Sequence, residues 1–166
     1  MTEENATLYR GLREVYIDRT TSSYIDGKAG KLYYRGFSID DLAENCSFEE
    51  IIYLVMIGEL PTTGELSEFV SDLKASMELP EPIIDIIRII KDAHPMDVLR
   101  TAISALATFD PEVNDNSTEA TLRKGTRLTA QAPTIVATHS RIREGKDPIK
   151  PDPDLSIAAN FLYMIF

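Results

Sequence analysis

The sequence predicts a mainly α-helical protein that begins with a short β element. β-forming residues and turn residues dominate up to Gly36, and from there to Phe166 apolar residues recur at helical spacing behind capping signals. The chain has 166 residues, of which 43% are apolar and 27% charged, a composition typical of one folded domain. We therefore divide it into an N-terminal β element, residues 1–36, and a helical domain, residues 37–166.

The β element is predicted to contain two or three short strands between Leu12 and Gly36. Val15, Ile17 and Arg19 fall on one parity, as the side chains on one face of a strand do. Further along, the runs SYIDG and KLYYRG stand on either side of a turn. This pattern is typical of short antiparallel strands.

Three segments then begin with a hydroxyl residue that an acid follows three residues later: 38–41, 47–50 and 62–65. Such a hydroxyl accepts a hydrogen bond from the backbone at the start of a helix. The second segment precedes the apolar run IIYLVMI, which Gly58 and Pro61 end. The third precedes apolar residues at helical spacing, namely Leu66, Phe69, Val70 and Leu73.

Prolines delimit the next two helices. The run IIDIIRII follows Pro80 and Pro82 and places one stripe of apolar side chains on a helix: Ile83, Ile86, Ile87 and Ile90. Pro95 suits the first position of a helix, so residues 94–109 predict a helix that stops before the pair Asp110-Pro111.

The last part of the chain predicts a long helix, a linker and a final apolar helix. Ser117 can cap a helix over 117–145, and Pro133 predicts that this helix bends or breaks near residues 131–134. The proline-rich run KDPIKPDPD is predicted to be a linker. The run DLSIAANFLYMIF then begins a helix that is almost entirely apolar, so we expect other apolar groups to pack against it.

Charge and composition exclude several classes of function. With 17 basic and 27 acidic residues the net charge is −10, which repels nucleic acid and anionic membrane surfaces. No apolar run approaches the roughly 18–20 residues that span a bilayer, and the first residues lack the pattern of a signal peptide. We therefore predict a cytoplasmic protein with no nucleic-acid partner and no membrane partner.

Common catalytic and cofactor motifs are absent from the sequence. It contains no G-x-G-x-x-G, P-loop, G-x-S-x-G, H-E-x-x-H or C-x-x-C motif. One cysteine and two histidines cannot supply a structural zinc site or a disulfide framework. We expect no cofactor-binding residues and no metal site.

Three residues could carry chemistry, and each also has a structural interpretation. His94 could act as a general base, but its place before Pro95 favours a neutral imidazole that accepts from N–H groups at a helix start. His139 could orient a substrate, or it could be an ordinary polar residue on a helix face. Cys46 lacks basic neighbours that would activate its thiol, so we expect a small buried apolar side chain. We prefer the structural interpretation for all three.

Basic residues gather in the second half of the chain: Arg123, Lys124, Arg127, Arg141 and Arg143. They could meet an anionic ligand. They follow an acidic cluster, however, which could pair with them inside the molecule: Asp110, Glu112, Asp115 and Glu119. We favour ion pairs on a solvated face.

Several linked runs resemble the N-terminal region of the citrate synthase family. They are GLREVYIDRTTSSYIDGKAGKLYYRGFSIDDLAENCSFEEIIYLVMIGELPT, HPMDVLRTAISALATFDPE, LRKGTRLTAQAPTIVATHSRIREGKDPI and PDPDLSIAANFLYMIF. The resemblance runs in order from about Gly11 to Phe166. The runs ENCSFEEIIYL and HPMDVLRTAIS are especially similar to the branch of the family that contains both citrate and 2-methylcitrate synthases. It implies the first half of a large helical domain, incomplete at its C-terminus. Ile157 departs from the S-H-A-A-N-F run of many relatives.

The resemblance implies an acyltransferase that condenses oxaloacetate with the enol of acetyl-CoA or propionyl-CoA. In the family two histidines and an aspartate perform this reaction, in motifs such as H-A-D-H-x-x-N-A-S-T and P-L-H-G-G. Neither motif occurs here, and neither His94 nor His139 has a matching context. We therefore assign no catalytic residue to this chain and expect it to be inactive alone, with acyl-CoA only a co-substrate of full-length relatives.

The resemblance also implies a homodimer, formed through the helices predicted at 94–109 and 117–145. On these we expect an interface of Ile103, Leu106, Ala107, Ile135 and Val136, together with the apolar residues 161–166. An alternative function is a non-catalytic helical module that self-associates or pairs with a separately encoded second half. An unrelated helical scaffold is a third alternative, which the ordered run of motifs disfavours.

Overall fold

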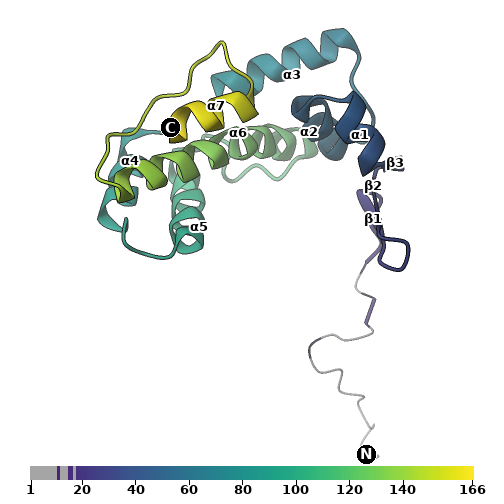
Figure 1. Ribbon diagram of the computed structural model, residues 1–166, viewed down its shortest axis with the longest axis horizontal. Coiled ribbons are helices and arrows are strands. Elements are labelled where there is room, and N and C mark those ends of the chain that lie inside the picture. Colours follow the sequence, from purple (N-terminus) through teal and green to yellow (C-terminus); the bar gives the residue numbers. More distant parts are fainter. Residues whose placement is uncertain (1–10, 12–14, 17) are drawn as a thin grey trace, which may run out of the picture.

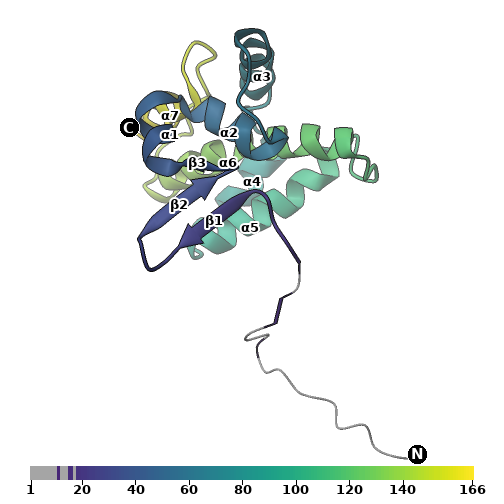
Figure 2. The same cartoon turned by 90° about the vertical axis from the view of Figure 1, so that its right-hand side faces the viewer.

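The computed structural model describes residues 11, 15–16 and 18–166. Most of them lie in helices, and a small antiparallel sheet of the order β1-β2-β3 lies at one end of the helical body, next to α1 (Figures 1 and 2). Within the described residues the expected mainly α-helical fold with a short β element is confirmed.

The sheet consists of β1 (Ser23–Asp26), β2 (Lys31–Tyr34) and β3 (Phe37–Ser38). Tyr24 pairs with Tyr33 across β1 and β2, and their rings are 6.1 Å apart. The number of strands agrees with the prediction. A strand was also expected from the parity of residues 15–19, but residues 15, 16, 18 and 19 are not in a strand. Ile17 lies outside the described residues. Parity identifies a face, whereas a strand also needs a neighbouring backbone to pair with.

The first three helices begin at their predicted caps. They are α1 (Ile39–Asn45), α2 (Phe48–Ile57) and α3 (Thr63–Ala75). Ser38 accepts a hydrogen bond from the backbone N–H of Asp40, and complete capping boxes precede α2 and α3. Gly58 ends α2 with a φ of 113°, a conformation that a side chain would strain.

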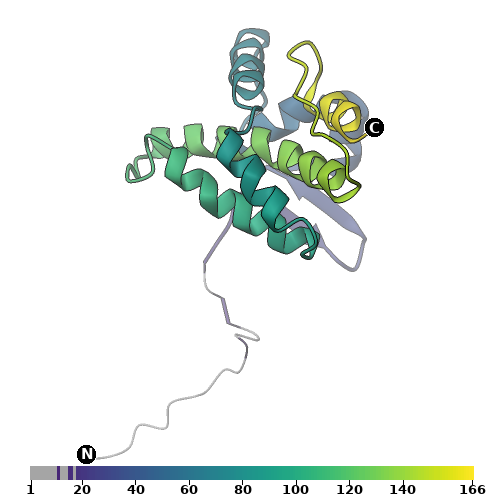
Figure 3. The same cartoon turned by 90° about the vertical axis from the view of Figure 1, so that its left-hand side faces the viewer.

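The remaining elements are α4 (Glu81–Ile89), α5 (Pro95–Leu106), the 3-10 helix η2 (Ala107–Phe109), α6 (Thr118–Arg143) and α7 (Ile157–Ile165). Ser117 caps α6 and Ser156 caps α7. The long helix α6 runs through the middle of the molecule, and α3, α4, α5 and α7 all pack against it (Figures 1 and 3). The proline-rich segment between α6 and α7 is the predicted linker.

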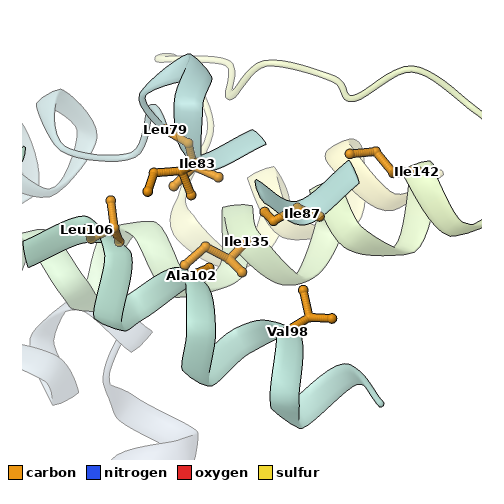
Figure 4. Packing of buried hydrophobic residues seen from close by; sticks show 8 residues of the cluster. All are labelled: Leu79, Ile83, Ile87, Val98, Ala102, Leu106, Ile135 and Ile142. Carbon is orange, nitrogen blue, oxygen red and sulfur yellow. The ribbon is translucent and has the colours of Figure 1, made fainter. Parts of the chain in front are cut away.

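The main core lies where α4, α5 and α6 meet (Figure 4). Its buried side chains are Leu79, Ile83, Ile87, Val98, Ala102, Leu106, Ile135 and Ile142. A second cluster joins α2, α3, α6 and α7 through Ile52, Leu73, Met77, Ala130 and Ile157. Burial of this kind stabilises a fold by about 25 cal/mol for each Å² of apolar surface removed from water.

Of the two outcomes predicted at Pro133, a bend or a break, the break was wrong and the bend stays a prediction. Helix α6 continues without interruption from Thr118 to Arg143, with Pro133 inside it. A proline removes one backbone hydrogen bond from a helix. Here the buried residues around it, Ala130, Thr134 and Ile135, are held by packing from neighbouring helices, and this packing outweighs the local cost.

Two buried polar residues seat α7. Oε1 of Glu49, on α2, accepts a hydrogen bond of 2.9 Å from the backbone N–H of Ile157, the first residue of α7. The Asn160 side chain accepts from the backbone N–H of Asp152 and donates to the carbonyl oxygen of the same residue. The start of α7 and the linker before it are therefore fixed by specific hydrogen bonds, since buried polar groups are costly when they have no partner.

Candidate functional site

His94 caps a helix, as its structural interpretation predicted. It is the N-cap of α5, and its Nδ1 accepts a hydrogen bond of 3.2 Å from the backbone N–H of Met96, directly after Pro95. A ring nitrogen that accepts a hydrogen bond carries no proton. The ring therefore completes the helix start that its sequence position indicated.

His139 has a structural contact that neither sequence interpretation anticipated. Its side chain is buried in α6, and Nε2 lies 2.9 Å from the carbonyl oxygen of Lys91. The ring thus connects α6 to the turn between α4 and α5. The expectation of an ordinary polar face residue was wrong because the partner lies 48 positions away, beyond the reach of local patterns.

Cys46 is half-buried, which differs from the expectation of a buried apolar side chain. It is a free thiol at the C-cap of α1, and its backbone N–H donates to the carbonyl oxygen of Leu42. The end of a helix that lies at the surface leaves this side chain partly in contact with solvent. A lone cysteine in this position suggests no chemistry.

Three of the five basic residues, Arg123, Lys124 and Arg127, contact the acidic loop before α6, as favoured from the sequence, whereas Arg141 donates to the carbonyl oxygen of Asp147 instead. Nη2 of Arg127 lies 2.8 Å from Oδ1 of Asp110 and 3.0 Å from Oε2 of Glu112. Nε of Arg123 donates to Glu112 over 3.0 Å, and Nζ of Lys124 donates to two backbone carbonyls of the same loop. These contacts hold the loop between η2 and α6 against the helix.

The ion pairs shift the pKa values of the two loop carboxyls. Partial burial opposes ionisation of Asp110, but hydrogen bonds from Arg127 and from the backbone N–H of Glu112 outweigh it and lower the Asp110 pKa. The hydrogen bond from Arg123, assisted by Arg127, lowers the pKa of Glu112. Both carboxyls therefore favour the ionised form that pairs with the arginines. Arg123 and Arg127 are thus occupied by ion pairs within this chain.

An apolar groove lies beside these ion pairs, between α5, η2 and α6. It encloses about 210 Å³, and its apolar lining includes Ile103, Phe109, Val113 and Leu128. The last three side chains are exposed. We call these four residues the α5/α6 groove; a surface of this kind suits a protein partner better than a small polar substrate.

The interface expected from the sequence is partly wrong. Leu106 and Ile135 are buried in the core of this chain and face no partner. Val136, one residue further along α6, is 40% exposed, and Ala107 is also exposed. Met164, among the expected interface residues 161–166, is buried within this chain. The periodicity identified the apolar residues correctly. It did not show which apolar stripe α4 covers, because that depends on how α4 packs on α5 and α6.

A second cavity of about 310 Å³ lies under the proline-rich linker. Thr134 and Thr138 of α6 line it, together with Pro148, Ile149 and Pro151 of the linker. The Thr134 hydroxyl is buried and has no hydrogen-bond partner among the described residues. Among its charged lining residues Lys150 forms an ion pair with Glu78, and Arg88 forms one with Glu81. Sequence patterns gave no sign of this cavity.

Metal-ligating clusters and membrane-spanning helices are both absent from the described part of the chain. No group of three or more histidine, cysteine, aspartate or glutamate side chains there could hold a metal ion. No helix there combines the length and the apolar character needed to cross a membrane.

Comparison with known proteins decides the family. Residues 11–166 match the family model described as citrate synthase, C-terminal domain. The chain belongs to the citrate synthase family. It is 41% identical to a citrate synthase of Haloferax volcanii and 42% identical to 2-methylcitrate synthase 1 of Corynebacterium glutamicum, each match covering 95% of this chain.

Solved structures of citrate synthases have the same fold. The enzyme of Pyrobaculum aerophilum superposes with a TM-score of 0.90 at 38% identity, over 94% of this chain and 41% of that one. A citrate synthase of Thermoplasma acidophilum, in complex with carboxymethyl coenzyme A and oxaloacetate, superposes with a TM-score of 0.89 at 26% identity. The chain spans about two fifths of the length of the relatives it matches.

Proposed function

We propose that this chain is part of a synthase that condenses oxaloacetate with acetyl-CoA or propionyl-CoA. The observation that carries the proposal is the match over nearly the whole chain, which includes both curated citrate and 2-methylcitrate synthases. The fold of the Thermoplasma acidophilum protein, which holds a coenzyme A derivative and oxaloacetate, supports the same reaction class. We assign the chain the role of a helical scaffold, since no residue in it carries the family's catalytic motifs.

The chain alone is expected to show no synthase activity. A condensation of this kind needs donors placed where negative charge develops on the carbonyl and enol oxygens. His94 caps α5 and His139 binds the Lys91 carbonyl, so both imidazoles already have structural partners. The measurement is CoA release from oxaloacetate with acetyl-CoA and, separately, with propionyl-CoA.

Turnover by the purified chain that His94→Ala or His139→Ala abolishes would contradict this expectation. Supplying the part of a relative that this chain does not match provides the positive test. We expect CoA release to appear only in the combined sample. The ratio of the rates with the two donors then distinguishes a citrate synthase from a 2-methylcitrate synthase.

A second candidate function is a helical module that self-associates through residues 94–109 and 117–145. The α5/α6 groove favours it, because Phe109, Val113 and Leu128 are large apolar side chains left exposed around one cavity. Burying each of them in an interface would contribute about 1.5–3 kcal/mol. A two-fold homodimer is the commonest assembly of this kind.

Sedimentation of the purified chain tests this assembly. We expect a species of twice the 18.6 kDa chain mass at tens of micromolar. Leu128→Glu should lower the mass to that of the monomer, because it places a charge in the α5/α6 groove. Ile89→Glu is the matched control, since Ile89 is 81% exposed on α4 outside the groove. A wild-type chain that stays monomeric would rule the assembly out.

A further inference from the structure

The loop between η2 and α6, residues 110–117, is held in place by polar contacts and not by burial. None of its residues is buried, and it protrudes at the end of the molecule where α6 begins (Figures 2 and 3). The side chains that reach it from α6 are Arg123, Lys124 and Arg127. Apolar burial, which fixes most segments of a fold, therefore contributes little to the position of this loop.

The two sides of this contact carry opposite charges. Nη2 of Arg127 lies between two carboxylates, 2.8 Å from Asp110 and 3.0 Å from Glu112. Arg123 pairs with Glu112, and Lys124 donates to two backbone carbonyls of the loop. The side chains of Asp110, Glu112 and Arg127 are only 17–29% exposed, so water screens them less than it screens fully exposed ion pairs. We call this set of contacts the loop clasp.

The clasped loop is one wall of the α5/α6 groove. Asp110, Pro111 and Val113 of the loop line the groove, and so do Lys124 and Arg127 of α6. If the loop moved away, the groove would lose the apolar surface of Pro111 and Val113 and would gain two cations without their partners. Unpaired charges beside an apolar surface oppose the binding of an apolar partner. The shape and the chemistry of the groove thus both depend on whether the clasp is closed.

Contacts between charges respond to salt, whereas an apolar core largely does not. The distance over which exposed charges act falls from about 10 Å at 0.1 M salt to about 3 Å at 1 M. We propose that the loop clasp is a salt-sensitive switch, which keeps the wall of the α5/α6 groove in place when closed and removes it when open. The closed groove takes a second copy of the chain. This occupant rests on the self-association proposed above, but the opening of the loop does not.

Cleavage by the glutamate-specific protease Glu-C at the bond between Glu112 and Val113 measures the open state. A protease cuts a folded segment through its transiently opened form, so the rate of cleavage follows the open population. The Arg127→Gln variant should be cut about tenfold faster than the wild type, because it loses charge-assisted hydrogen bonds to two carboxylates. The Arg127→Lys variant keeps the charge and should be cut at a rate closer to that of the wild type.

The matched control is Arg100→Gln. Arg100 lies on α5 outside the groove lining and forms an exposed ion pair with Asp97, so this variant should be cut at the wild-type rate.

A salt series on the wild type tests the switch without any substitution. Raising NaCl from about 0.05 M to about 0.5 M should speed cleavage of the wild type several-fold, and that of Arg127→Gln much less. A synthetic peptide of residues 108–118, cut in parallel at each concentration, corrects for the effect of salt on the protease. This series decides the question even if a variant does not fold.

Three results would overturn the proposal. The first is a corrected wild-type rate that salt leaves unchanged. The second is an Arg127→Gln variant cut no faster than Arg100→Gln. The third is an Arg127→Lys variant cut as fast as Arg127→Gln, which would show that the positive charge is not what holds the loop.

Sedimentation of the same variants separates the clasp from the self-association. We expect Arg127→Gln to raise the dissociation constant of the dimer about tenfold, since the groove loses one wall and gains an unpaired Lys124. A chain that stays monomeric while its loop responds as expected keeps the clasp and rejects the second copy as occupant. An open loop with an unchanged dimer keeps the self-association and overturns the role of the clasp in it.

Discussion

Ile135→Ala is expected to lower the free energy of unfolding by about 2–5 kcal/mol, the range for removing a large aliphatic side chain from a packed core. Ile135 is 1% exposed and lies among Val98, Ala102 and Ile87 in the cluster between α4, α5 and α6 (Figure 4). Truncation would leave a cavity that rigid neighbouring helices cannot fill by collapsing. Val136→Ala, one residue further along, should change the same quantity by no more than about 0.5 kcal/mol because its side chain is largely outside the core.

Urea denaturation followed by far-UV circular dichroism measures both variants, with the slope of the transition used to check that each unfolds in one step. The comparison decides between two roles for the same stripe of α6. If Ile135 faced another subunit, as the sequence suggested, its truncation would change the sedimentation of the chain more than its stability. Equal losses of stability for the two variants would contradict the packing described here.

Local features of the fold were predictable because their causes lie within a few residues of one another. Ser47 and Glu50 form a complete capping box with both hydrogen bonds closed over three positions, and His94 caps α5 beside Pro95. Arg123 and Arg127 of α6 pair with Glu112 and Asp110 in the acidic loop directly before the helix. Each of these interactions is fixed by spacing along one turn or one short connection, which the sequence displays directly.

Features that depend on distant segments were not predictable in the same way. His139 is buried because the Lys91 carbonyl approaches it, and Leu106 and Ile135 are core residues because α4 lies across them. Pro133 disrupts a helix in isolation, but four neighbouring helices hold α6 in place. Of the candidate site, the sequence indicated the helices that carry the α5/α6 groove. It did not separate the exposed members, Phe109, Val113 and Leu128, from the buried ones, because hydrophobic spacing identifies apolar stripes but not what covers them.

Glu49 is a further residue whose role only the tertiary structure reveals, and Glu49→Ala is expected to cost about 2–3 kcal/mol of unfolding free energy. Its sequence position suggests an ordinary acid in the first turn of α2. Its carboxylate is instead buried and accepts from the backbone N–H of Ile157, so truncation would leave a buried donor without a partner. It would also remove a negative charge from the N-terminus of α7, where the helix dipole favours one.

The loss should be concentrated in α7, which distinguishes it from a general weakening of α2. Hydrogen exchange read by mass spectrometry should show faster exchange in residues 157–165 of the Glu49→Ala variant. Glu49→Gln keeps an oxygen that can accept from Ile157 and should restore much of the protection while lacking the charge. Glu50→Ala is the matched neighbour: it opens the capping box of α2 and should cost only about 1 kcal/mol, with its exchange effect at the start of α2. Unchanged exchange in α7 of the Glu49→Ala variant would show that the serine cap and the apolar contacts of Ile157 and Met164 suffice to seat this helix.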